Sequence, residues 1–189
     1  IQRILDMGVE LQLNTTVDDI EAAFTQEGFN AVFVAVGAHL AKRINIPANA
    51  AGKILDAVSV LRDMETGAEP PQLGRRVIVY GGGNTAMDVA RTTKRLGADD
   101  TMIVYRRSRN EMPAHDFEAR EAEEEGVMIH WLHTIKYIDE TTFTVEKMEI
   151  DEAGRPQPTG VVETIEADTL ILALGQDVDT SFLENVAGV

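Results

Sequence analysis

Residues 76–91 read RVIVYGGGNTAMDVAR, and this stretch decides the fold. The apolar run at 77–80 predicts a short buried strand, and the three glycines after it predict a tight turn. From residue 84 to residue 96, apolar side chains recur at helical spacing, at Ala86, Val89, Ala90 and Leu96. The order of strand, glycine turn and helix predicts the first half of a βαβ unit.

The segments on either side complete an α/β fold. Residues 102–105 predict a second strand parallel to the first, and an acidic helix over 114–125, with a solvated Glu-rich face at 121–125, leads to a third strand at 127–131. Short alternating runs then predict an antiparallel β-meander at 135–139, 142–150 and 161–167, and a buried strand follows at 169–174. We therefore expect a Rossmann-like domain with a parallel sheet and an added meander.

The amino-terminal part has weaker patterns. They predict the end of a helix before Gly8, a strand at 9–13 and a helix at 18–26. A strand at 31–36 is expected to be buried on both faces and to end at Gly37. A crossover at 41–52, a helix at 56–65 and a linker at 67–74 follow. A first residue of Ile1 without a signal-like segment is expected of an internal piece of a longer chain. The alternative is a complete small protein without its first residues.

The glycine turn has the spacing G-x-G-x-x-A of a dinucleotide-binding turn, from Gly81 through Gly82 and Gly83 to Ala86. Gly81 permits the tight turn, Gly83 lets a diphosphate approach the backbone, and Ala86 lets the helix pack closely on the sheet. Free N–H groups and the helix dipole then face the anion, and Asn84 and Thr85 can add hydrogen bonds. The alternative is an ordinary structural turn.

Three arginines follow the second strand, at the position where an NAD-preferring domain has an acidic residue. They are Arg106, Arg107 and Arg109. A guanidinium can bind the 2′-phosphate of NADP(H) with two hydrogen bonds, whereas a carboxylate would repel it. This favours NADP(H), and the alternative is salt bridging to the acidic helix that follows.

Composition excludes several classes of protein. With 17 basic and 32 acidic residues the formal charge is −15, so we expect neither nucleic acid nor a membrane as a partner. The absence of cysteine excludes a disulfide, a Cys-ligated zinc and an iron–sulfur site in this stretch, and it fits a reducing, cytoplasmic location. His130 and His133 are expected on opposite faces of a strand, so no metal site is predicted, and no side chain is assigned a catalytic role.

The whole chain resembles the glutamate synthase small subunit family, which includes the amino-terminal half of dihydropyrimidine dehydrogenase and NADPH-dependent ferredoxin oxidoreductase subunits. The resemblance rests on VYGGGNTAMDVAR at 79–91, VYRRS at 104–108, EMPA at 111–114, AVGA at 35–38 and ALGQ at 173–176. It implies an NADPH-dependent flavoprotein oxidoreductase that passes hydride from NADPH to FAD. In the intact parent, an iron–sulfur or large catalytic subunit would then take the electrons.

The resemblance also implies a domain division. Residues 1–40 would be the later part of an FAD-domain segment, 41–74 a crossover with a helix, 75–177 the NADP(H)-binding domain, and 178–189 the start of the return to the FAD domain. Gly37 would lie near the flavin, and Ala173, Leu174 and Gly175 near the nicotinamide nucleotide. Two alternatives stay open: a non-catalytic NADP(H)-sensing domain, and an S-adenosylmethionine-dependent methyltransferase, against which Arg106 argues.

Overall fold

The computed structural model describes residues 1–26, 28–42, 44, 46–47, 53–184 and 186. The chain divides into two compact units, one made of residues 1–38 and 178–189 and the other of residues 39–177. Among the described residues, no helix combines the length and the apolar character that crossing a lipid bilayer requires.

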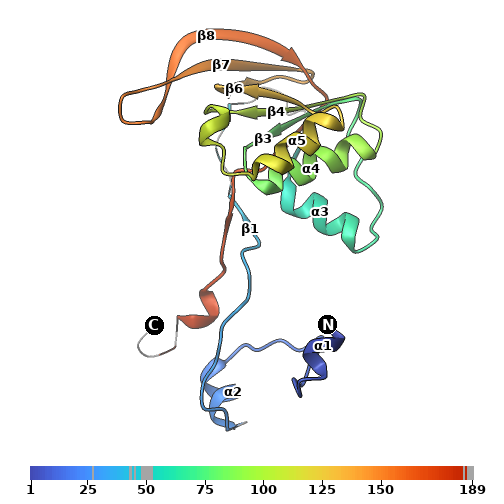
Figure 1. The fold of residues 1–189 in the computed structure, drawn as a ribbon, viewed down its shortest axis with the longest axis vertical. Helices are drawn as coiled ribbons and strands as arrows, with labels where there is room; N and C mark the ends of the chain where they lie inside the picture. The colour runs from blue at the N-terminus through green and yellow to red at the C-terminus, as the bar shows by residue number, and fades with distance from the viewer. Residues whose placement is uncertain (27, 43, 45, 48–52, 185, 187–189) are drawn as a thin grey trace. The chain divides into compact units, whose positions relative to one another are not determined.

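The 39–177 unit has three layers (Figure 1). Its centre is a parallel sheet with the strand order β2-β9-β3-β4-β5, made of β2 (Lys53–Asp56), β9 (Thr169–Leu172), β3 (Arg76–Tyr80), β4 (Asp100–Tyr105) and β5 (Met128–Trp131). One face carries the helices α3 (Ala57–Glu65), α4 (Asn84–Arg95) and α5 (Asp116–Glu124). The other face carries an antiparallel sheet of β6 (His133–Ile138), β7 (Thr142–Ile150) and β8 (Pro156–Glu166). The predicted α/β fold, with its parallel sheet and its meander, is confirmed.

Alternation along the central strands creates the two hydrophobic cores between the layers. In β3, Val77 and Val79 pack in the core under the helices, whereas Ile78 and Tyr80 pack in the core against the antiparallel sheet. Both faces of the strand are therefore apolar, which is why the sequence shows a continuous run instead of alternation.

Two features of this unit were not predicted. Among the described residues β2 pairs with β9 alone, at the edge of the sheet, and it has exposed residues, so its pattern is weak. β8 begins at Pro156, five residues before the strand predicted at 161–167. Pro156 and Pro158 argued against a strand, but β8 is the edge of its sheet, where proline is tolerated. A short antiparallel pair of β1 (Leu40–Ala41) and β10 (Gln176–Asp177) joins the two ends of the unit.

The other unit contains α1 (Gln2–Leu5), α2 (Ile20–Gln26) and the 3-10 turn η2 (Ser181–Leu183). The strands predicted at 9–13 and 31–36 are wrong, because neither segment joins a sheet. Phe33 is 92% exposed and Val34 is 41% exposed, although the pattern predicted burial on both faces. An apolar strand is buried only when neighbouring strands and helices cover it, and the described residues of this unit supply no strand to pair with it.

Arg91 joins α4 to α5 within the helical layer. Its guanidinium lies 2.8 Å from a carboxylate oxygen of Glu121 and 2.7 Å from one of Glu125, which Arg95 also contacts. Hydrogen bonds from Arg95 and Arg91 lower the pKa of Glu125 to about 2. The Glu-rich stretch at 121–125 is therefore only partly a solvated face, because Glu125 is half-buried and binds two arginines.

Glu125→Gln should make the stability of the protein less sensitive to acid. The pKa of Glu125 is lower in the folded state than the usual 4.5, so its contribution is complete above about pH 4.5 and is lost as the pH falls towards 2. The difference in Tm between the native protein and the variant should shrink across this range in thermal melts. Glu124→Gln is the control, since Glu124 forms no ion pair with any described residue. A Tm difference for Glu125→Gln that stays constant with pH would contradict the lowered pKa of Glu125.

Candidate functional site

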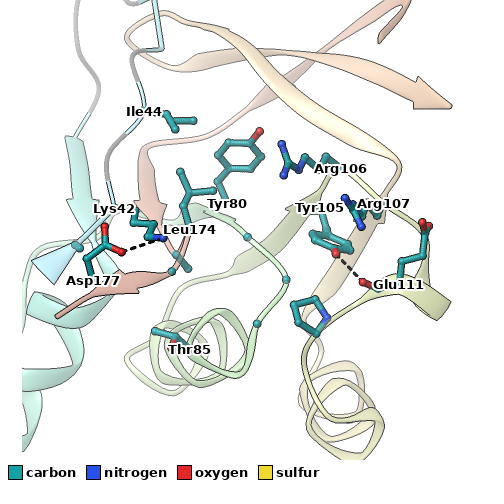
Figure 2. A pocket seen from close by; sticks show the side chains of 17 residues that line it. Lys42, Ile44, Tyr80, Thr85, Tyr105, Arg106, Arg107, Glu111, Leu174 and Asp177 are labelled. Atoms are coloured by element: carbon teal, nitrogen blue, oxygen red, sulfur yellow. Dashed lines mark hydrogen bonds and ion pairs between the residues drawn. The ribbon is translucent and has the colours of Figure 1, made fainter. Parts of the chain in front are cut away.

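A cleft of about 1070 Å³ opens at the carboxyl ends of β3, β4 and β9 in the 39–177 unit (Figure 2). In open parallel sheets, ligands bind at this edge. Most of the residues predicted to bind the cofactor line the cleft: Gly81, Gly82, Gly83, Thr85, Arg106, Arg107, Ala173, Leu174 and Gly175. Four predicted residues, Asn84, Ala86, Arg109 and Gly37, do not line it.

The three glycines of the turn meet different surroundings. Gly81 has a φ of +148°, and a Cβ added there would lie 2.1 Å from the carbonyl oxygen of Ala173. A Cβ on Gly82 would lie 2.4 Å from the ring of Tyr105. A Cβ on Gly83 would meet nothing within 4 Å, and Gly83 lines the cleft. The first two glycines let the strands approach the turn, and the third leaves open space where a diphosphate can reach the backbone.

Helix α4 begins directly behind Gly83, which is its N-cap residue and makes no side-chain cap. The first N–H groups of a helix have no acceptor within it, so they and the helix dipole favour an anion at this end. Thr85 lines the cleft, and Ala86 is fully buried where α4 packs on the sheet. The side-chain oxygen of Asn84 instead accepts a hydrogen bond of 3.0 Å from the His115 N–H, which fixes the start of α5 beside the turn.

The arginine cluster divides into two groups. Arg106 and Arg107 follow β4 directly and line the cleft beside Tyr80 and Tyr105 (Figure 2), and neither forms an ion pair with any residue that the structure describes. Arg109 lies 3.1 Å from Glu123 and 3.5 Å from Asp116. Arg109 is therefore salt-bridged to the acidic helix, whereas the guanidinium groups of Arg106 and Arg107 are available to bind an anionic ligand.

Tyr105 forms the floor beneath the turn. Its ring lies under Gly82, and its hydroxyl donates a hydrogen bond of 2.9 Å to the backbone oxygen of Glu111. Burial raises the pKa of Tyr105, which keeps the hydroxyl in its neutral, donating form. The Glu111 carboxylate accepts hydrogen bonds from the backbone N–H and the hydroxyl of Ser108, at 3.2 and 2.8 Å. The carboxylate of Glu111, one of the acidic residues that line the cleft, is thus hydrogen-bonded within its own capping box.

The opposite wall is the segment that follows β9. The backbone N–H of Ala173 donates a hydrogen bond of 2.8 Å to the backbone oxygen of Tyr80. The backbone N–H of Lys42 donates one of 3.1 Å to the backbone oxygen of Gly175. The Lys42 ammonium pairs with Asp177 at 3.0 Å (Figure 2). Lys42 and Asp177 were not predicted as lining residues, because the pairing of β1 with β10 brings them together across more than 130 residues of chain. The only local signal was their position next to the predicted ends of the domain.

Gly37 belongs to the 1–38 and 178–189 unit and has a φ of +71°, a left-handed conformation that favours glycine. His130 and His133, predicted to point to opposite faces of a strand, lie with their ring centroids 3.9 Å apart. That prediction is wrong, because Leu132 between them adopts a left-handed conformation with a φ of 56°.

Several known proteins are similar to this chain. A family model described as pyridine nucleotide-disulphide oxidoreductase matches residues 5–189. The chain is 37% identical to the NADP(+)-dependent formate dehydrogenase subunit beta of Moorella thermoacetica, over 97% of this chain and 28% of that protein. It is 36% identical to the glutamate synthase [NADPH] small chain of Azospirillum brasilense, over 82% of this chain and 37% of that protein.

The solved structure of Mycobacterium tuberculosis FprA in complex with NADPH superposes on this chain with a TM-score of 0.67 at 20% identity. The match covers 86% of this chain and 54% of that one, and it shows that the two share a fold. The chain thus spans less than two fifths of the length of the two curated relatives. The match of the family model over nearly the whole chain shows that the chain belongs to the pyridine nucleotide-disulphide oxidoreductase family.

Proposed function

We propose that this chain is the NADP(H)-binding module of a flavin-dependent oxidoreductase that passes hydride from NADPH to FAD, similar to the glutamate synthase small subunit. The observation that carries the proposal is the cleft itself. It combines an open glycine at a helix N-terminus with two arginines that have no ion-pair partner among the described residues. In a chain with a formal charge of −15, such a pocket is suited to an anion that carries several phosphates.

The lining residues fit the parts of NADP(H). The diphosphate would lie over Gly83 and the first N–H groups of α4. Arg106 and Arg107 would hold the 2′-phosphate through charge-assisted hydrogen bonds and exclude NADH by leaving two charges unpaired. Ala173, Leu174 and Gly175 would line the nicotinamide end. The volume of about 1070 Å³ is adequate for a ligand of this size.

The bound nicotinamide and flavin supply the hydride donor and the acceptor. The chain's own residues bind and orient: the glycine turn fixes the diphosphate, and the arginines fix the adenosine end. No side chain of the cleft has to act as an acid, a base or a nucleophile, so we assign no catalytic residue.

We further propose that residues 1–40 and 178–189 are segments of the FAD-binding domain in the intact parent, with 41–74 as the crossover and 75–177 as the NADP(H)-binding domain. The exposed apolar side chains of residues 31–36 support this, because they suit a segment that other parts of a larger domain would cover. Gly37 would then lie near the flavin. One relative is a beta subunit and another is a small chain, which supports an iron–sulfur or large catalytic subunit as the partner.

The test is anaerobic addition of NADPH to the intact parent protein. We expect the protein to carry FAD, seen in its visible absorbance, and NADPH to bleach the oxidised flavin band rapidly, whereas NADH acts at least tenfold more slowly. Tight NADPH binding without flavin, or without flavin reduction, would instead indicate a sensing domain and would overturn the redox proposal.

A further inference from the structure

Three potential metal ligands meet in the 39–177 unit, at the junction of β5 with β6. His130 is on β5, His133 begins β6, and Glu163 is on β8. One ligand atom from each side chain lies within 4.8 Å of the other two. The Nε2 atoms of His130 and His133 lie 2.7 and 3.4 Å from the same carboxylate oxygen, Oε1 of Glu163. Two imidazoles and a carboxylate therefore converge on one point.

The strand registers explain this convergence. His130 pairs with Val104, and Glu163 pairs with Val145. Val104 and Val145 both belong to the core between the parallel and antiparallel sheets. Since directly paired residues point to the same face of a sheet, His130 and Glu163 approach each other from the two facing sheets.

Leu132 completes the arrangement. A φ of 56° is unfavourable for leucine, and such conformations persist only where the surroundings hold them. Two hydrogen bonds hold this one: the Leu132 N–H donates to the Arg107 oxygen at 3.1 Å, and the Met148 N–H donates to the Leu132 oxygen at 2.7 Å. The strained residue brings the two histidines to the same side, which the spacing of two residues between them would not do in a regular strand.

A backbone carbonyl group fixes the orientation of the His133 ring. Its Nδ1 lies 2.7 Å from the backbone oxygen of Trp131, which can only accept a hydrogen bond, so Nδ1 carries a proton. With the proton on Nδ1, the Nε2 atom faces the Glu163 carboxylate, which is the orientation that both need in order to bind one cation. A backbone carbonyl behind the ligand nitrogen is the usual second partner of a metal-bound histidine.

His130 and His133 are 25% and 15% exposed, and Glu163 is 49% exposed. The histidines are thus held in place, while the carboxylate is free to adjust.

We propose that His130, His133 and Glu163 bind a zinc ion through the two Nε2 atoms and the carboxylate, with water in the fourth position. Tetrahedral zinc with bonds near 2.0–2.1 Å holds its ligand atoms about 3.3 Å apart. The His133–Glu163 distance of 3.4 Å already fits, and the His130–Glu163 distance of 2.7 Å must open by roughly 0.6 Å, a small movement for an exposed glutamate. Magnesium and calcium are disfavoured, because they prefer oxygen ligands throughout.

Zinc at this position would fasten β5 of the parallel sheet to β8 of the antiparallel sheet. It would also rigidify the backbone at Leu132, which is hydrogen-bonded to Arg107 in the cleft. None of the three proposed ligands lines the cleft, so the zinc proposal does not depend on the proposed redox function.

The test is zinc titration of the full-length, untagged protein after treatment with a chelator. We expect one zinc per chain to bind at this site with a Kd in the micromolar range or below, and Tm to rise by several degrees. His130→Gln and Glu163→Gln should each weaken this binding at least tenfold. His39→Gln is the matched control, because His39 is an exposed histidine outside the cluster, and it should bind zinc like the native protein.

Cobalt provides a second readout that does not require any variant to fold. Co²⁺ bound by two nitrogens and two oxygens in a tetrahedron gives an intense visible absorption band, which zinc should displace. Absence of stoichiometric binding, absence of a tetrahedral cobalt band, or equal zinc affinity in the native protein and in folded His130→Gln or Glu163→Gln would overturn the proposal. In the last two cases, His130, His133 and Glu163 form only a hydrogen-bonded ion pair.

Discussion

Gly81→Ala is expected to lower the free energy of unfolding by about 2–4 kcal/mol, through backbone strain and overpacking. The φ of +148° is a conformation that alanine adopts only with strain, and the added Cβ would lie 2.1 Å from the Ala173 oxygen. That oxygen belongs to the backbone and cannot rotate away, so β3 and the segment after β9 must separate. Urea unfolding of the full-length protein, followed by circular dichroism, measures the loss.

Gly83→Ala is the matched control, because it adds the same methyl group two residues further along the same turn. Gly83 has a φ of −91°, and the Cβ would meet no protein atom within 4 Å. We expect it to cost up to about 1 kcal/mol of stability as an N-cap change, but to weaken NADPH binding at least tenfold by filling the space that the diphosphate needs. Equal destabilisation by the two variants, or native NADPH affinity in Gly83→Ala, would contradict these separate roles.

Replacing Arg106 and Arg107 together with alanine is expected to weaken NADPH binding by about 100-fold and to change NADH binding by less than about threefold. Hydrogen bonds to charged groups contribute about 1.5–3 kcal/mol, and 1.4 kcal/mol corresponds to a factor of ten. Only NADPH carries the 2′-phosphate, so the loss should fall on NADPH alone. Calorimetric titration of the folded variant with both nucleotides gives the two affinities.

Arg109→Ala provides the control for this experiment. Its guanidinium is already paired with Glu123 and Asp116, so it should leave the NADPH-to-NADH affinity ratio unchanged. A parallel loss of NADH and NADPH binding in the double variant would mean that the arginines hold some other part of the nucleotide. A changed ratio in Arg109→Ala would mean that its ion pairs open when the ligand binds.

The elements that the sequence predicts correctly are those whose cause is local. The run at 77–80, the glycine turn and the apolar side of α4 each carry their own signal, and the chain order then fixes a parallel sheet with one ligand-binding edge. Gly83, Arg106 and Arg107 could be assigned to that edge because they directly follow predicted strands.

The predictions that are wrong, for residues 31–36 and for His130 and His133, concern features that depend on distant neighbours, and the environment of Arg109 depends on them too. Residues 31–36 have a buried-strand pattern, but no pattern within the segment says what covers it. Arg109 looks equivalent to Arg106 until α5 places Glu123 beside it. His130 and His133 were separated by assuming a regular strand, because nothing in the identity of Leu132 predicts a left-handed conformation.

The most direct measurement is a titration of the full-length protein with NADPH, NADH and 2′-phospho-AMP. We expect NADPH to bind at least about tenfold more tightly than NADH, since one charge-assisted hydrogen bond already supplies that factor. We also expect 2′-phospho-AMP to displace NADPH. Equal affinity for NADPH and NADH, with no competition from 2′-phospho-AMP, would contradict the assignment of Arg106 and Arg107 to the 2′-phosphate.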